Sequence, residues 1–536
     1  MRMALIGIMA IVAPVTAQAQ AGASAVVELP LADLSARIAG GRMTSEAATR
    51  GYLARIAAMD RKGPTLRSVI AVNPDALAQA RASDARAKAG RRLGPLDGVP
   101  ILIKDNIETL DPIATTAGSL ALKDNVTRRD APVVARLRAA GAVILGKTNL
   151  SEWANIRSTR SMSGWSAVGG LVRNPYALDR TACGSSSGSG AAVAASFAAA
   201  ALGTETDGSV VCPSAINGLV GLKPTVGAVS RTRVVPISHS QDTPGPMARS
   251  VRDAAMLYSA MVGSDPADAA TKGADAQRRD YAAGLSEGAL KGVRVAVLRP
   301  DMTADLKSRF DAALAVLTAA GATLVDVQRP PTPGLGDAEG LVLYTELKAD
   351  LDAYLATTPA AVRTRTLDQV IAFNDANAAA EMPYFAQETF LAAAKTKGLA
   401  DPAYRAAREK SRAQAAGAID AMLKNADARL IVAPSYGAAW FSDPVHGDRS
   451  TGASASQLPA ISGYPHLTVP MGLVRALPVG LSFIGPEWSE QMLLAAGYAY
   501  EVRAKARQAP RYLPSADAGP GMDGAVAPAR RLSVRR

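Results

Sequence analysis

The sequence predicts an α/β fold: a large mixed β-sheet packed against helices, with a helical insertion. The first observation is composition, since 48% of the 536 residues are hydrophobic and only 4% are aromatic, which suits closely packed helices on a sheet. The second is a strand, a helix and a strand in succession between residues 101 and 145, the order of a βαβ unit. The third is a series of strand candidates separated by helical patterns, without any repeat. We therefore expect one elaborated domain.

Two helices open this domain. Apolar residues recur at helical spacing over Leu31 to Ile38 and again over Tyr52 to Met59, the pattern of a helix with one buried face. Thr44 or Ser45 is expected to cap the second helix, because a hydroxyl oxygen can accept a hydrogen bond from a free N–H group there. Ile101 to Lys104 then reads as a short buried strand.

The helix of the βαβ unit is expected to be capped by Asp130, with Pro132 in its first turn and Gly141 after its last. Ala142 to Leu145 follows as the second strand. Further strands are predicted over Val293 to Leu298, Thr323 to Val327, Leu430 to Ala433, Leu467 to Val469 and Val479 to Ile484.

The second half of the chain contains a long segment that is mainly helical. Residues from about 300 to 424 lack strand signals after Val327, so we expect a helical insertion packed over the sheet. The domain is expected to span residues 26–512. Residues 513–536 are rich in Pro, Gly and Ala and carry four arginines, Arg530, Arg531, Arg535 and Arg536, near their end, a composition typical of a disordered, solvated tail.

The first residues read as an export signal. Arg2 precedes an apolar run from Met3 to Val15, and an Ala-x-Ala step follows at Ala17 to Ala19, the pattern of a cleavable signal peptide. We expect residues 1–19 to be removed and the mature protein to be periplasmic or secreted. The run is too short for a stable membrane anchor, and no later run approaches the roughly 20 residues that a span needs.

The distribution of charge indicates which partners to expect, and the two cysteines indicate whether a disulfide is possible. The formal net charge is +12, but basic residues alternate with Asp and Glu instead of forming a stripe with aromatics, so nucleic acid is not an expected partner. Nothing in the sequence specifies an oligomeric state. Cys183 and Cys212 could form one disulfide in an oxidising compartment if their Cα atoms lie about 4.4 to 6.8 Å apart.

A Gly/Ser-rich loop at residues 182–190 (ACGSSSGSG) leads into an Ala-rich helix. Gly184, Ser186 and Gly188 fit the G-x-S-x-G pattern of a hydrolase elbow, but that motif needs a strand before it, and residues 179–181 make a poor one. A tight turn is the plain interpretation of this loop taken alone.

Two more segments change that interpretation: residues 95–107 (PLDGVPILIKDNI) and residues 203–225, which contain GTETDGSVVCPS. Together with the Gly/Ser loop they resemble the amidase-signature family. Ser185 and Ser209 are 24 residues apart and Lys104 precedes both, the separation and order of that family. The resemblance continues through residues 146–155, 240–250 and 480–485, and Asp207 within TDGS is similar to the bacterial peptide amidase branch. The resemblance to this family implies a large, mixed, twisted sheet covered by helices on both faces.

The resemblance also implies the roles of the site residues. Ser209 is expected to be the nucleophile, Ser185 a bridging serine preceded by a cis peptide bond, and Lys104 the base. Backbone N–H groups of Thr206, Asp207 and Gly208, together with that of Ser209, are expected to stabilise the oxyanion.

The expected base must be neutral to accept a proton. Bringing the pKa of Lys104 from about 10.4 to near 7 costs about 4 kcal/mol, a shift that burial at the end of an apolar strand can supply. Asp105 should not oppose it, because successive strand residues point to opposite faces. Asp207 stands where a glycine is commoner in the family, so its carboxylate must point away from the oxyanion.

Other kinds of site fit poorly. A Ser-His-Asp hydrolase would need one of the three histidines, His239, His446 and His466, near Ser186. A catalytic zinc site usually takes three protein ligands, but the sequence has no His-x-x-x-His or paired-Cys spacing. We therefore expect neither a metal nor another cofactor.

The expected substrate is a primary carboxamide, with the C-terminal amide of a peptide as the first choice and aryl or aliphatic amides as the alternative. An exported solute-binding protein is the non-enzymatic alternative, although it would have no use for a buried lysine beside two serines. A tRNA-dependent amidotransferase subunit shares the motifs, but it works in the cytosol, and the expected export signal argues against it.

Overall fold

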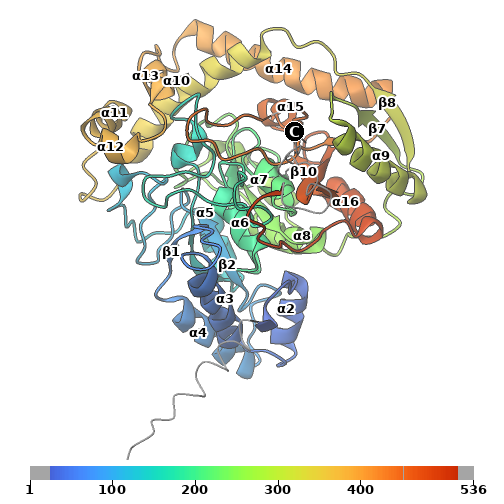
Figure 1. Ribbon diagram of the computed structural model, residues 1–536, viewed down its shortest axis with the longest axis horizontal. Coiled ribbons are helices and arrows are strands. Elements are labelled where there is room, and N and C mark those ends of the chain that lie inside the picture. Colours follow the sequence, from blue (N-terminus) through green and yellow to red (C-terminus); the bar gives the residue numbers. More distant parts are fainter. Residues whose placement is uncertain (1–23, 451, 517–536) are drawn as a thin grey trace, which may run out of the picture.

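One β-sheet forms the centre of the molecule in the computed structural model, which describes residues 24–450 and 452–516 (Figure 1). The expected signal, residues 1–19, and residues 517–536 of the expected tail lie outside the described residues. The strands are β1 Val69–Val72, β2 Pro100–Lys104, β3 Val143–Thr148, β4 Ala200–Glu205, β5 Val220–Lys223, β6 Thr243–Ala248, β7 Arg294–Leu298, β8 Thr323–Val327, β9 Leu430–Pro434, β10 His466–Val474 and β11 Leu477–Ile484.

The described strands form an 11-stranded sheet in the order β1-β3-β2-β4-β6-β5-β10-β11-β9-β7-β8. Strand β2 runs parallel to β3 and β4, and β7 runs parallel to β8 and β9. The central pairs β4·β6, β6·β5, β5·β10, β10·β11 and β11·β9 are antiparallel. The sheet is therefore mixed, as predicted.

Helices cover both faces of this sheet. Leu467 and Val469 in β10 pack beside Gly497, whereas Thr468 between them lies on the face that carries Ala215. This alternation places α16 and α7 on opposite faces. The α-helices are α2 Leu31–Ala39, α3 Ser45–Met59, α4 Ala76–Lys88, α5 Pro132–Ala139, α6 Ser187–Ala194, α7 Val211–Ile216, α8 Val251–Met261, α9 Ala304–Ala319, α10 Leu335–Leu355, α11 Leu367–Ala376, α12 Ala378–Glu381, α13 Glu388–Ala394, α14 Pro402–Asn425, α15 Gln457–Ser462 and α16 Glu490–Ala504.

The helix caps bear out one expectation and correct another. Thr44 caps α3 by accepting a hydrogen bond from Ala47 N. The prediction that Asp130 caps α5 is wrong: the capping position is Ala131, and the Asp130 carboxylate accepts from Leu110 N at 2.8 Å and from Arg138 Nε at 2.9 Å. Because Pro132 already occupies the first helical position, Asp130 lies one residue too early to cap.

Helices α10 to α14 extend along one side of the molecule, at the top of Figure 1. Leu347, Leu367 and Phe390 from α10, α11 and α13 form a hydrophobic cluster with Trp153. Helix α14 instead packs its apolar face against β9 and α15.

In the described part of the chain, no helix combines the length and the hydrophobicity of a membrane span. Leu513, at the start of the expected tail, accepts a hydrogen bond from Leu178 N at 2.8 Å.

Candidate active site

The pairing of β2 with β4 brings Lys104 to the centre of the site. The two strands are parallel, with Ile103 opposite Leu202, so their carboxyl ends meet at one edge of the sheet. Lys104 Nζ donates to Thr204 Oγ1 at 2.9 Å and to Thr204 O at 3.2 Å. It also donates to Ser185 Oγ at 2.7 Å. The lysine and Ser185 are fully buried.

The Gly/Ser loop brings Ser185 to this lysine. The Gly184–Ser185 peptide bond is cis, as the resemblance implied. Ser186 fixes the loop to β4, because its Oγ donates to Thr204 O at 3.1 Å and accepts from Thr204 N at 3.2 Å. Its N–H group donates to Ser209 O at 3.2 Å. The sequence offered Ser186 only as an accidental motif match, whereas the structure shows that it joins three parts of the site.

Ser209 lies at the end of a tight turn that connects β4 to α7. It is 8% exposed, and its Oγ has no hydrogen-bond partner among the described residues. Gly208 has φ +80°, and a side chain at this position would collide with the Tyr436 hydroxyl. Within the same described ranges, the N–H groups of Asp207, Gly208 and Ser209 donate to no other protein atom, so this turn leaves donors for a ligand.

Burial gives Lys104 the protonation behaviour that a base needs. Removal from water lowers its pKa to about 7, although the charges of Asp242 and Glu205 oppose the shift. Asp105 does not contribute: its carboxylate accepts from Thr116 and lies 3.8 Å from Lys147 Nζ. The pKa of Lys104 thus lies near 7, the value that burial was expected to produce.

The sequence motifs did not assign Gln241 and Asp242, which support the turn from outside. Asp242 Oδ1 accepts from Thr206 Oγ1 at 2.5 Å, and Gln241 Nε2 donates to Thr206 O at 3.3 Å. Gln241 Nε2 also donates to Glu339 Oε1 in α10 at 3.1 Å. Both residues belong to the recognised segment 240–250, but only the folded chain shows that this segment holds Thr206.

The side chain of Asp207 turns towards α10. Its carboxyl lies beside Glu339 and Ser456, and burial raises its pKa. Burial and the neighbouring Asp207 carboxylate likewise raise the pKa of Glu339, to about 8. Because two adjacent buried carboxylates favour sharing a proton, Asp207 adds less negative charge to the turn than a free carboxylate would.

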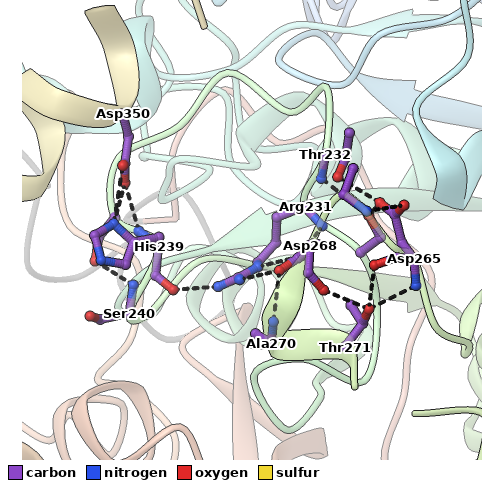
Figure 2. Close-up of polar contacts among 12 residues, drawn as sticks. Arg231, Thr232, His239, Ser240, Asp265, Asp268, Ala270, Thr271 and Asp350 are labelled. Atoms are coloured by element: carbon purple, nitrogen blue, oxygen red, sulfur yellow. Dashed lines mark hydrogen bonds and ion pairs between the residues drawn. The ribbon is translucent and has the colours of Figure 1, made fainter. Parts of the chain in front are cut away.

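Figure 2 shows the network that anchors the segment preceding Gln241. Arg231 binds the Asp268 carboxylate and the carbonyl oxygen of His239. His239 donates from its backbone N to Asp350 Oδ2 in α10 at 2.9 Å, and its Nδ1 lies 2.9 Å from the same oxygen. Burial lowers the pKa of His239, but the hydrogen bond to Asp350 and the charge of Glu346 outweigh it and raise the pKa. The histidine therefore bridges this segment to α10 most strongly when protonated.

The same histidine belongs to the cluster with metal-ligating residue types that the described residues contain, namely His239, Glu346 and Asp350. Both oxygens of Glu346 are already occupied, since they accept from Ser240 Oγ, from Ser240 N and from the Tyr404 hydroxyl. We therefore interpret the cluster as an ion-paired bridge. The other two histidines do not pair with the candidate serines either. His466 Nε2 lies 2.6 Å from Ser482 Oγ, and His446 Nδ1 lies 2.7 Å from Asp443 Oδ2.

A disulfide joins Cys183 to Cys212, with their Cα atoms 6.0 Å apart. It links the Gly/Ser loop to α7, so the pairing that the sequence left open is settled. The sulfur-bearing side chains pack with Ile216, Ala439 and Leu477.

Comparisons with known proteins identify the family of this chain. The family model described as Amidase matches residues 47–494. A probable amidase of Arabidopsis thaliana is 37% identical over 497 residues, covering 91% of this chain and 92% of that protein. A glutamyl-tRNA(Gln) amidotransferase subunit of Halorhodospira halophila is 35% identical over 496 residues, covering 88% of this chain and 96% of that protein.

Solved structures give the same result. The native peptide amidase of Stenotrophomonas maltophilia is 48% identical, with a TM-score of 0.86 over 90% of this chain and 99% of that one. A peptide amidase solved in complex with the competitive inhibitor chymostatin matches with the same identity, coverage and TM-score. The family match spans most of the chain, and the fold is similar over 90% of it. The chain therefore belongs to the amidase-signature family and is an amide hydrolase.

Proposed function

We propose that this protein releases ammonia from the C-terminal amide of peptides through a Ser209–Ser185–Lys104 relay. The observation that carries the proposal is the 2.7 Å hydrogen bond between Lys104 Nζ and Ser185 Oγ in a fully buried setting. There Lys104 has a pKa of about 7, so an appreciable fraction of the lysine is neutral at physiological pH.

The proton moves inward as the amide is attacked. Ser209 Oγ bonds to the carbonyl carbon and gives its proton to Ser185 Oγ, which passes its own proton to the neutral Lys104 Nζ. Ser209 Oγ has no partner among the described residues, so we expect it to approach Ser185 Oγ when substrate binds, as catalytic hydrogen bonds often tighten only in the complex.

The turn before Ser209 is suited to the negative charge that develops next. Its unengaged N–H groups, those of Asp207, Gly208 and Ser209, can donate to the oxyanion without rearrangement. We also assign the backbone N–H group of Thr206 to the proposed oxyanion hole. Gln241 and Asp242 hold the carbonyl and hydroxyl groups of this residue in place. Collapse of the intermediate breaks the C–N bond, the relay returns a proton to the nitrogen, and ammonia leaves. Water then hydrolyses the Ser209 ester by the same relay and yields a carboxylate.

Two observations favour a peptide as the acyl group. Ser163 touches the Gly184 end of the serine loop, since an added Cβ on Gly184 would lie 3.0 Å from Ser163 Oγ. Two residues further on, Trp165 stacks edge-to-face with Tyr384, with ring centres 5.6 Å apart, and Tyr384 is 48% exposed. Trp165 itself is buried, so the exposed ring of Tyr384 is the aromatic surface of this pair that can pack against peptide side chains. The likeness to a peptide amidase that binds the competitive inhibitor chymostatin points the same way.

A comparison of matched substrates tests the specificity. An amidated dipeptide should be hydrolysed with a higher kcat/KM than the same dipeptide extended by one residue. Gln241 connects Glu339 of helix α10 to Thr206 in the turn, and we expect this helix to close the leaving-group side of Ser209 to groups larger than ammonia. Ammonia release and peptide cleavage are measured with purified protein, with a simple aliphatic amide as the third substrate. Faster cleavage of the extended peptide would contradict the proposal, and preference for the aliphatic amide would remove the peptide from it.

Metal removal should not affect turnover. The relay and the turn amides complete the site, and the carboxylate oxygens of Glu346 in the His239 cluster are occupied by hydrogen bonds. We expect kcat/KM to stay within about twofold after dialysis against a strong chelator. Activity that is lost on chelation and restored by a divalent ion would contradict this assignment.

We further propose that the protein is exported. A buried disulfide in a chain with only two cysteines suits an oxidising compartment, and residues 1–19 read as a cleavable signal. N-terminal sequencing of the protein expressed in a Gram-negative host should give a mature start near Gln20. Recovery of the uncleaved chain from the cytosol would contradict export.

A further inference from the structure

We propose that the Cys183–Cys212 disulfide positions the two catalytic serines, so that the oxidised protein hydrolyses amides faster than the protein without this bond. The inference rests on the proposed roles of Ser185 and Ser209.

The bond lies between the two reacting segments. Ser185 follows Cys183 by two residues, and Ser209 precedes Cys212 by three. Both cysteines are buried, at 5% and 1% exposure. The disulfide therefore connects the short peptide that carries the bridging serine to the first turn of the helix that follows the nucleophile.

Hydrogen bonds also join the two segments. At the end of α7, Asn217 Nδ2 donates to Ala182 O at 2.9 Å. The hydrogen bond from Ser186 N to Ser209 O, at 3.2 Å, joins them near the serines. Cys212 N donates to Gly208 O at 2.8 Å, so the helix end of the disulfide is tied directly to the turn that presents Ser209. A displacement at Cys212 would therefore reach the turn through one hydrogen bond.

The loop end of the disulfide is conformationally constrained as well. Cys183 has φ +55°, a region that L-residues other than Gly seldom occupy without a constraint from their surroundings. The Ser187 hydroxyl donates to Cys183 O, and Thr181 Oγ1 accepts from Cys183 N at 3.0 Å. Once the crosslink is removed, residue 183 is held in this conformation by fewer restraints. We expect it to relax partly and to shift Ser185, two residues away.

The surrounding scaffold does not depend on this bond. Strand β4 is paired on both sides, with β2 and β6, and Asn217 Nδ2 donates to Ala182 O at 2.9 Å. The loss should therefore leave the fold in place and change the separation of the serines by a small amount. Rates of this kind of relay fall steeply with sub-ångström misplacement of the reacting groups.

The test is the double variant Cys183→Ala/Cys212→Ala, which leaves no thiol to mispair. We expect kcat to fall at least 10-fold with KM changed less than about threefold, while far-UV circular dichroism stays that of wild type and thermal unfolding stays cooperative. The rate at which a fluorophosphonate labels Ser209 should fall in parallel. A double variant with wild-type kcat, or one in which only KM changes, would overturn the proposal.

Reduction of the wild type gives a second measurement if the variant does not fold. A dithiol breaks the S–S bond by transferring two electrons and two protons, which yields two protein thiols and the cyclic disulfide of the reagent. Activity should fall in proportion to the thiols counted by alkylation and mass spectrometry, while circular dichroism is unchanged. Activity that is constant as thiols appear, or that falls only with unfolding, would overturn it.

The same assays separate this proposal from the proposed function. Ser209→Ala protein that still turns over amide would refute the relay itself. An inactive Ser209→Ala together with a fully active double variant would refute only the role of the disulfide.

Discussion

Replacement of Ser209 with alanine is expected to abolish amide hydrolysis while leaving the protein folded. Loss of the nucleophile in serine hydrolases lowers kcat by about 10⁴-fold to 10⁶-fold. Ser209 is 8% exposed, and its hydroxyl makes no hydrogen bond within the described ranges, so the fold should lose little stability with it. The measurement is ammonia release from an amidated dipeptide, together with fluorophosphonate labelling, which should disappear.

Ser214→Ala is the matched control for this variant. Ser214 lies in α7, five residues after Ser209, is fully buried, and its hydroxyl also lacks a partner among the described residues. The same substitution there should leave kcat and labelling near the wild-type values. Ser209→Ala protein that keeps a tenth of wild-type activity would show that another group is the nucleophile.

The wild-type kcat/KM is expected to rise with pH through about 7 and to level off above it. The reason is that only the neutral form of Lys104 accepts a proton, and burial lowers its pKa to about 7. Lys104→Met should lower kcat/KM by about 10²-fold to 10⁴-fold, the usual contribution of a positioned base, and should remove this rising limb. The pH profile from 5 to 10 checks both parts.

A second buried lysine provides the control. Lys147 is also fully buried, and burial likewise lowers its pKa. Its ammonium donates to Ile107 O at 2.6 Å and to Thr115 Oγ1 at 2.8 Å, whereas Lys104 donates to Ser185. Lys147→Met is expected to cost stability, but the rising limb of kcat/KM near pH 7 should remain. A flat profile for the wild type, or a limb that disappears only in Lys147→Met, would contradict the assignment of Lys104 as base.

Strong local patterns allowed much of the sheet to be predicted. The strands β2, β7, β8 and β9 consist largely of Val, Ile and Leu, and each was expected within about a residue of its bounds. Strands β1, β4, β5 and β6 were missed. Strand β4 is rich in Ala and Gly, and β6 (TPGPMA) contains two prolines. Pro244 and Pro246 lie opposite Thr204 and Leu202 of β4, but on the other side β5 pairs only with Met247 and Ala248. The two prolines are tolerated because no ladder hydrogen bond is required of them on the β5 side.

The site divides along the same lines. Lys104, Ser185 and Ser209 were predicted because each stands in a local motif, the two serines are 24 residues apart and the lysine precedes both. The supports of the turn were not found, because they act across the fold: Gln241 reaches Thr206 across 35 residues, and Glu339 reaches Gln241 across 98. Single residues of ordinary type at such separations leave no periodic signal in the sequence.

The sequence by itself determined the family, the three expected members of the relay and the mixed α/β class. Each of these depends on residues that lie close together in the chain or at a fixed spacing. Only the tertiary structure decided that Cys183 pairs with Cys212, that Asp207 turns towards Glu339, and that Asp242 rather than Asp105 lies close enough to oppose the shift in Lys104. The physical reason is that burial, charge and crosslinking act through distance in space. That distance is set when β2, β4 and β6 pair side by side.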